Sequence, residues 1–156
     1  MRSRRKAGLV SLALALSTAR GAEHGPIRWR TDETGAIAEA ARTGRPLVVD
    51  AWADWCAGCK LLDRNTWSDR RVQEEIAARY VPLRIDLSTQ DTTSVARMSA
   101  LGVSAVPAVL VCRATGCDAA GPRLVGYARP EEMLAFLRSS VPGALGPRSP
   151  GPAQPP

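Results

Sequence analysis

Apolar residues recur at helical spacing in some segments and at every second position or in short runs in others, which predicts helices and strands between residues 34 and 137. Segments with apolar residues at helical spacing are 34–42, 59–79 with a break near 66–68, 92–101 and 130–137. Short apolar or alternating runs, which are typical of strands, are 47–53, 80–87, 108–112 and 123–127. The predicted order is therefore helix, strand, helix, strand, helix, strand, strand, helix.

This order predicts the fold class. A helix between two strands lets them run parallel, whereas the short connection between the last two strands favours an antiparallel hairpin. The continuous apolar run from Ala108 to Cys112 is typical of a strand that is covered on both faces. We therefore expect an α/β fold with a mixed central sheet and helices on both faces.

The two ends of the chain differ in composition from the predicted domain at 22–141. Residues 1–21 combine a basic start, an apolar stretch and small residues, which is the pattern of a signal peptide cleaved after Ala19 or Gly21. The apolar stretch is shorter than the roughly 20 residues that a membrane-spanning helix needs, so we expect cleavage and export, for example to the periplasm. Residues 142–156 are rich in Pro, Gly, Ser and Gln and predict a disordered tail.

The net charge of +6 changes this picture little. Four basic residues, Arg2, Arg4, Arg5 and Lys6, lie at the very N-terminus, and the other arginines are scattered among acidic residues. A nucleic-acid-binding face would need a basic stripe, so we expect no nucleic-acid partner. The single histidine, His24, falls in a polar segment, where a solvated side chain is the simplest interpretation.

The candidate chemistry lies in the motif Cys56-Ala57-Gly58-Cys59, between the predicted strand at 47–53 and a helical pattern that opens at Cys59. Unpaired backbone N–H groups and the helix macrodipole favour a thiolate at Cys56, which would attack a disulfide. Cys59, one turn further on, would then attack the mixed disulfide and release the reduced partner. The other interpretation is half of a structural zinc site, which would need a second Cys/His pair.

The residues around this motif resemble the active site of the thioredoxin superfamily. An apolar strand that carries Asp50 runs into a Trp-Cys-x-x-Cys-Lys pattern that ends at Lys60. Within the superfamily, Ala53-Asp54-Trp55-Cys56 and Thr66-Trp67-Ser68-Asp69 are most similar to the C-terminal thioredoxin-like domain of the thiol:disulfide interchange protein DsbD and its stand-alone relatives. The likeness covers residues 37–137, and the predicted element order is that of the thioredoxin-like fold.

The resemblance implies roles for further positions. Asp50 would be a buried carboxylate with a raised pKa that accepts the proton of the resolving thiol; the alternative is a strand-end residue exposed to water. Val106 and Pro107 resemble the family's cis-proline loop, which offers backbone groups to an extended substrate segment. Trp55 would pack at the rim of the site or make an ordinary apolar contact. The Ala-Gly pair, and a following helix without a proline, differ from cytosolic thioredoxins.

A second cysteine pair, Cys112 and Cys117, lies outside the family motif. Four residues separate the two cysteines, so they would face each other across the end of a hairpin between the strand at 108–112 and the residues after Gly116. An oxidising compartment would let a structural disulfide form and persist there. The alternative is a buried free thiol at Cys112.

These observations favour an exported thiol:disulfide oxidoreductase that works through Cys56 and Cys59 without a cofactor or metal. The resemblance implies a reductase relay, in which a membrane-embedded donor supplies electrons that pass to oxidised client proteins. A second hypothesis is a thiolate metal-binding or metal-delivery protein, with Cys56, Cys59, Cys112 and Cys117 as ligands. A third is a catalytically quiet thioredoxin-fold binding module.

Overall fold

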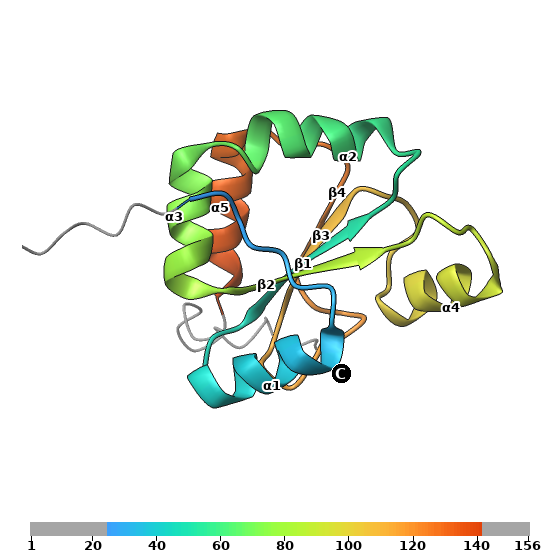
Figure 1. The fold of residues 1–156 in the computed structure, drawn as a ribbon, viewed down its shortest axis with the longest axis horizontal. Helices are drawn as coiled ribbons and strands as arrows, with labels where there is room; N and C mark the ends of the chain where they lie inside the picture. The colour runs from blue at the N-terminus through green and yellow to red at the C-terminus, as the bar shows by residue number, and fades with distance from the viewer. Residues whose placement is uncertain (1–24, 142–156) are drawn as a thin grey trace, which may run out of the picture.

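A four-stranded sheet crosses the middle of the computed structural model, which describes residues 25–141 (Figure 1). Its strands are β1 (Leu47–Trp52), β2 (Val81–Asp86), β3 (Ala108–Cys112) and β4 (Arg123–Val125). The strand order is β2-β1-β3-β4, with β1 and β2 parallel and the other two pairs antiparallel. The predicted mixed sheet is therefore confirmed, and β1 lies inside it with a neighbour on each side.

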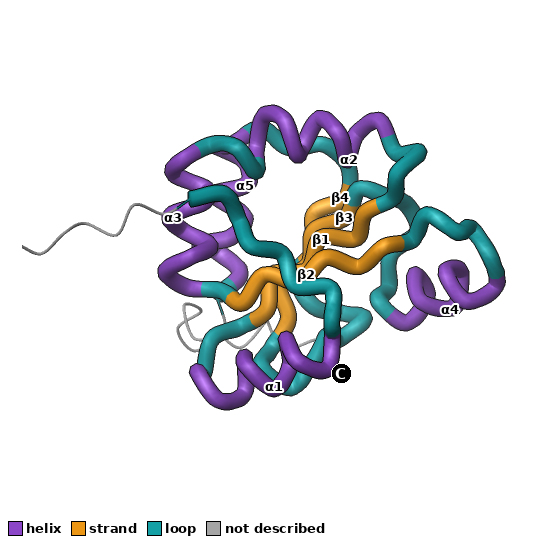
Figure 2. Tube along the Cα trace, viewed as in Figure 1, coloured by secondary structure: helices purple, strands orange, loops and turns teal. Residues whose placement is uncertain are grey.

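Helices cover both faces of the sheet, as the sequence predicts (Figure 2). On one face lie α1 (Glu33–Thr43) and α4 (Thr92–Ala100). On the other lie α2 (Ala57–Leu61), the π-helical turn η1 (Leu62–Thr66), α3 (Arg70–Arg79) and α5 (Pro130–Ser140). The result is a three-layer α/β arrangement in which the segment after β1 crosses one end of the sheet.

The alternation of side chains along β1 divides the core between the two faces. Leu47, Val49 and Ala51 pack with the α1 layer, whereas Val48 packs with the layer of α3 and α5. Every residue of β1 up to Ala51 is buried, because the strand is central and is covered on both faces. A charged residue at Asp50 therefore lies in the interior with no contact to solvent.

The helix after β1 begins at Ala57, two residues earlier than the apolar spacing predicts. Ala57 and Gly58 carry too little side chain to show a period, so the pattern becomes visible only at Cys59. The predicted break near residues 66–68 is confirmed: η1 ends at Thr66, and α3 starts after Asp69, whose side chain accepts hydrogen bonds from the N–H groups of Arg71 and Val72.

The last strand is shorter than the predicted 123–127, because β4 ends at Val125. Gly126 has a φ of 95°, a left-handed value that takes the chain out of the extended conformation. Its N–H donates to the carbonyl oxygen of Pro107 at 2.8 Å. The chain thus leaves the sheet beside the start of β3, and α5 then continues to Ser140, three residues beyond the predicted end.

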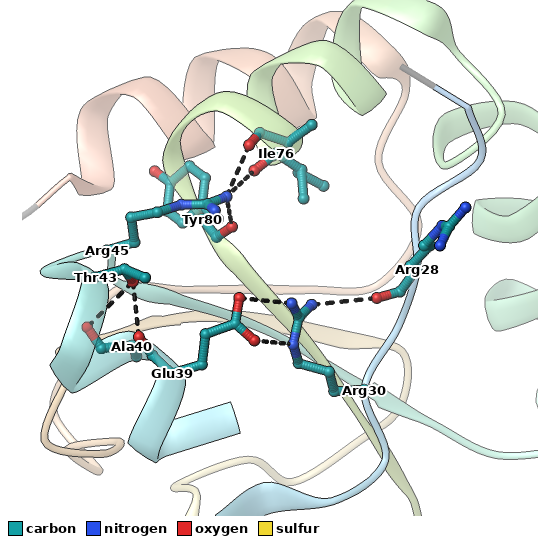
Figure 3. Close-up of polar contacts among 9 residues, drawn as sticks. Arg28, Arg30, Glu39, Ala40, Thr43, Arg45, Ile76 and Tyr80 are labelled. Carbon is teal, nitrogen blue, oxygen red and sulfur yellow. Dashed lines mark hydrogen bonds and ion pairs between the residues drawn. The ribbon is translucent and has the colours of Figure 1, made fainter. Parts of the chain in front are cut away.

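Two arginine contacts join neighbouring elements of the fold (Figure 3). Arg45 donates through Nη2 to the carbonyl oxygens of Ile76, at 3.3 Å, and Ala77, at 2.8 Å, and also contacts that of Tyr80. Arg30 forms a two-pronged ion pair with Glu39, with both N···O distances 2.6 Å. The first contact fixes the C-terminal end of α3, and the second fixes the segment before α1.

Within residues 25–141, no helix combines the length and apolar character that crossing a bilayer requires. The predicted signal segment 1–21, His24 and the predicted tail 142–156 lie outside the described residues. Their interpretation stays a prediction.

Candidate functional site: the Cys56–Cys59 disulfide

Cys56 and Cys59 are joined by a disulfide where the chain leaves β1 and enters α2, with their Cα atoms 5.3 Å apart. Cys56 is the N-cap residue of α2, and its Sγ accepts a hydrogen bond from the N–H of Cys59 at 3.1 Å. The two cysteines keep 5% and 1% of their surface exposed, respectively. Cys56 is therefore the more accessible of the two.

The backbone around Cys56 favours a negative charge on its sulfur. An N–H group that points at the sulfur stabilises the thiolate relative to the thiol. Helix α2 runs directly into η1, so the helical segment that starts after Cys56 continues to Thr66, and its N-terminal end adds a positive partial charge. Cys59 lies inside the helix and is almost fully buried, which makes it the less accessible partner for another protein.

The loop before β3 packs against this disulfide. The peptide bond between Val106 and Pro107 is cis. Val106 packs on a small cluster formed by Ala53, Cys56 and Cys59. A Cβ atom placed on Gly58 would lie only 2.9 Å from Cδ of Pro107, so the space between the two cysteines accepts glycine and no larger residue without movement of the loop. The structure thus brings Val106 and Pro107 to the motif.

Trp55 lies at the rim of this site, with half of its surface exposed. Its indole N–H donates to the carbonyl oxygen of Ser88 at 3.1 Å, and the N–H of Asp54 donates to the hydroxyl of Ser88 at 2.9 Å. These two bonds hold the loop before Cys56 against the end of β2. Trp55 is consequently a fixed, exposed aromatic surface next to the disulfide.

Asp50 is fully buried on β1 and is paired with an arginine that the sequence analysis did not single out. Arg84 lies opposite Asp50 in the parallel register of β1 and β2. Its Nε and Nη2 are 2.9 Å and 2.7 Å from Oδ2 of Asp50, and Nη2 is also 2.5 Å from Oδ1 of Asp63 on η1. One guanidinium group therefore holds two carboxylates, one buried and one partly exposed.

Burial raises the pKa of Asp50 to about 6, because the charged form loses its hydration. The charge of Arg84 and its hydrogen bond act in the opposite direction, and the nearby Asp63 raises the pKa further. Trp67 has the smallest effect and lowers the pKa of Asp50. Neither the indole N–H of Trp67 nor Oδ1 of Asp50 makes a hydrogen bond to the described residues. One oxygen of Asp50 is thus left available for a proton.

Two tryptophans flank the guanidinium of Arg84. Its Cζ lies 5.0 Å from the ring centroid of Trp29 and 5.5 Å from that of Trp52. Such cation–π contacts favour the charged arginine in a partly buried position. The sequence does contain a signal for this residue, since Arg84 is a charged side chain inside an apolar strand, but the register that pairs it with Asp50 is visible only in the fold.

Cys112 and Cys117 are also joined by a disulfide, with their Cα atoms 4.5 Å apart. They flank a tight turn in which Arg113 and Gly116 form an antiparallel bridge. Cys112 pairs with Leu47 at the beginning of β1, whereas Cys56 follows the end of that strand. At about 3.3 Å per residue, the six-residue β1 strand keeps the two cysteine pairs apart.

This separation makes the hypothesis of a four-cysteine metal site wrong. The four sulfur atoms form two bonds at opposite ends of the sheet and do not gather around one point. No group of three or more His, Cys, Asp or Glu side chains suited to a metal ion occurs in the part of the chain that the structure describes. Among residues 25–141, no second Cys/His pair lies beside the 56–59 motif, as the half-zinc-site interpretation would require.

Comparisons with known proteins agree with the fold and the motif. The thiol:disulfide interchange protein DsbD of Ralstonia nicotianae is 32% identical over 123 residues, which are 79% of this chain and 20% of that protein. DsbD of Escherichia coli is 33% identical over 107 residues, or 69% of this chain and 18% of that protein. The chain thus spans about a fifth of the length of these relatives.

Solved structures show the same fold. The C-terminal domain of Neisseria meningitidis DsbD in its oxidised form matches with a TM-score of 0.59 at 20% identity, covering 72% of this chain and 98% of that domain. Its reduced form matches with a TM-score of 0.58 at 22% identity, covering 69% and 92%, respectively. A family model described as a thioredoxin-like domain matches residues 34–140. The chain belongs to the thioredoxin-like family, and the predicted resemblance is confirmed.

Proposed function

We propose that this protein is an exported thiol:disulfide oxidoreductase that reduces disulfides in client proteins through Cys56 and Cys59. The observation that carries the proposal is the asymmetry of the motif. The sulfur of Cys56 is the more accessible one and accepts the N–H of Cys59, whereas Cys59 is buried behind it. An attacking thiol needs both access and a stabilised thiolate, and Cys56 combines them.

The reaction proceeds in two exchanges. The Cys56 thiolate of the reduced protein attacks one sulfur of a client disulfide, forms a mixed disulfide and expels the first client thiolate. The Cys59 thiolate then attacks Sγ of Cys56, which breaks the mixed disulfide and expels the second client thiolate. Two electrons have moved to the client, and the Cys56–Cys59 disulfide seen here is the product. A dithiol donor must restore the reduced form.

Asp50 would accept the proton of the Cys59 thiol before the second exchange. Three features support this role: full burial, a pKa raised to about 6, and an oxygen, Oδ1, without a hydrogen bond. A base with a pKa near neutrality is well suited to proton transfer. Arg84 donates to Oδ2 of Asp50. Because Oδ2 is occupied in this way, the proton goes to Oδ1.

The loop at Val106 and Pro107 would bind the client segment next to the reacting sulfur. Its contact with Gly58 places main-chain groups beside Cys56, where an extended segment can pair with them. Trp55, exposed at the rim, would cover the other side of that segment. Such contacts would act on a polypeptide and not on a small disulfide, which supports proteins as the substrate class.

Likeness to the C-terminal domain of DsbD supports the reducing direction and a membrane-embedded electron donor. The Ala-Gly pair between the cysteines supports the same direction, because it adds no charge that would stabilise the reduced form strongly. Export rests on residues 1–21, and we place the folded domain at 22–141. N-terminal sequencing of protein from a periplasmic fraction tests the cleavage after Ala19 or Gly21.

Reduction of insulin by the purified protein, with a dithiol as electron source, tests the activity. We expect catalysed reduction and a reduction potential well below the roughly −120 mV of strongly oxidising proteins of this fold. A potential near that value would contradict the reducing direction. A wild-type protein that catalyses no exchange with any disulfide would contradict the activity itself and would favour the quiet binding module.

A further inference from the structure

Arg123, on β4, joins two segments that lie outside the site described above. Through Nη1 it donates to the carbonyl oxygen of Leu101 at 3.3 Å and contacts that of Gly102. Through Nε and Nη2 it donates to three carbonyl oxygens of the turn at 118–121: those of Asp118, Ala119 and Gly121. All its hydrogen bonds within residues 25–141 go to main-chain oxygens, and hydrogen bonds from a charged donor are stronger than neutral ones.

The first of these segments leads directly to the loop that carries Val106 and Pro107. Leu101 and Gly102 directly follow α4, and the N–H of Val103 donates to the carbonyl oxygen of Met98 at 2.9 Å. Four residues after Val103, the chain reaches Pro107. Gly102 has a φ of 63°, and a Cβ atom there would lie 2.5 Å from the carbonyl oxygen of Ala119. The residues after α4 and the 118–121 turn therefore lie close together, and the guanidinium of Arg123 bonds to both.

The second segment is fixed by the Cys112–Cys117 disulfide. That bond ties Cys117, the residue before the turn, to the end of β3. On the other side of the turn, the N–H of Val111 donates to the carbonyl oxygen of Pro122 at 3.1 Å. The turn that supplies three of the carbonyl oxygens is thus anchored to β3 at both ends and gives Arg123 a rigid support.

We infer that Arg123 is a positioning residue that holds the loop at 103–107 against Cys56 and Cys59, and that the Cys112–Cys117 disulfide is part of its support. The inference rests on the proposed function, since it concerns how that site binds its client. Arg123 touches neither cysteine. It fixes one end of the loop, while Gly126 fixes Pro107 at the other.

This position predicts a selective effect on catalysis. A protein client needs the main chain of the loop in place, whereas a small disulfide needs access only to the sulfur of Cys56. Loss of the Arg123 contacts should raise KM for insulin about tenfold while kcat, the rate with glutathione disulfide and the reduction potential stay unchanged. A defect of the fold as a whole would alter all of these quantities together.

The experiment compares Arg123→Met and Arg123→Lys with Arg45→Met. Arg45 is a matched control, because it also donates to several main-chain carbonyl oxygens, but those lie at the C-terminal end of α3 and at Tyr80 (Figure 3). Arg123→Met should raise KM for insulin. Arg123→Lys should raise it less, since lysine keeps the charge with fewer donors. Arg45→Met should leave KM unchanged. Replacement of both Cys112 and Cys117 by Ser should raise KM in the same direction by about threefold.

Amide hydrogen exchange supplies a second readout that does not depend on activity. Arg123→Met should speed exchange of the Val103 amide at least tenfold relative to the wild type, while amides of β1 keep their protection. If the wild type reduces no disulfide, the proposed function fails, but this measurement still decides whether Arg123 holds the loop. Equal rises in KM and equal losses of amide protection in Arg123→Met and Arg45→Met, or unchanged exchange of the Val103 amide, would overturn the inference.

Discussion

The two disulfides of this protein are the same bond in different surroundings. Cys56 and Cys59 lie at a helix start, with an N–H group aimed at one sulfur and a buried carboxyl group on the adjoining strand. Cys112 ends a strand that is buried throughout, and Cys117 follows a four-residue turn. Reactivity therefore depends on groups that stabilise the thiolate or take up the proton of the thiol once the bond opens, and within residues 25–141 only the first pair has both.

The largest expected effect separates the two pairs completely. Cys56→Ser should abolish disulfide exchange, because the attacking thiolate is lost, while Cys59→Ser should accumulate mixed disulfides that mass spectrometry detects. Replacing both Cys112 and Cys117 by Ser should retain the chemical step. Alkylation at graded pH assigns the roles, and a lower thiol pKa at Cys59 than at Cys56 would reverse them.

A smaller effect concerns the buried carboxyl group, and its sign follows from the raised pKa. Below about pH 4 Asp50 is neutral in the folded and the unfolded chain, so its burial carries no charge penalty. Between about pH 4 and 6 the unfolded chain loses the proton first, so stability falls as pH rises. Above pH 6 the penalty is complete, at about 3 kcal/mol for a shift of about two units.

Asp50→Asn removes this penalty. Relative to the wild type, the variant should gain stability as pH rises from 4 to 7, by at most about 3 kcal/mol, because Arg84 also loses one of its two carboxylate partners. Its turnover at neutral pH should fall severalfold with an unchanged reduction potential. Urea unfolding at several pH values and insulin kinetics measure the two effects, and a pH-independent difference in stability would show that Asp50 does not titrate in this range.

The second disulfide should affect stability and client binding but not the chemical step. Opening its short loop by Cys112→Ser together with Cys117→Ser should cost about 2 kcal/mol by the chain-entropy argument. Urea unfolding of this variant, with Cys56 and Cys59 intact, measures the loss. Peptide mapping without reductant provides the control, and free, alkylatable Cys112 and Cys117 in exported wild-type protein would show that the bond does not form in the cell.

The smallest change tests the contact between the motif and the loop. Gly58→Ala would place a methyl group 2.9 Å from Pro107, so the loop must shift and insulin reduction should fall about threefold to tenfold. Ala57→Ser is the matched control, because Ala57 is exposed and its side chain points away from the core. Equal rates for the two variants would show that the contact does not matter for client binding.

Most of the fold was predictable from the sequence because local signals are consistent. Gly44 ends α1 in a left-handed conformation, Asp69 caps α3, and the apolar run at 108–112 lies in a covered strand. The start of α2 was predicted late, since two small residues carry no period. β4 was predicted too long, since the conformation of Gly126 ends it.

The chemistry of the site was only partly predictable. The motif itself names Cys56 and Cys59, and a carboxylate inside an apolar strand points to Asp50. Arg84, Asp63 and Arg123 could not be assigned in this way, because their partners are distant in sequence and depend on strand register, on a π-helical turn and on a loop contact. Local patterns show which residues are unusual, and tertiary packing decides which of them meet.

The π-helical turn η1 has a consequence for how this segment can change in length. It holds Asp63 against Arg84 while Leu62 and Thr66 stay buried. Each residue of a regular helix adds a rotation of about 100°, so the deletion of one residue here would turn Asp63 away from the guanidinium and misalign the buried positions. We therefore expect homologous chains with the Asp50–Arg84–Asp63 contact to conserve the spacing from Cys59 to Thr66, even where the side chains between them differ.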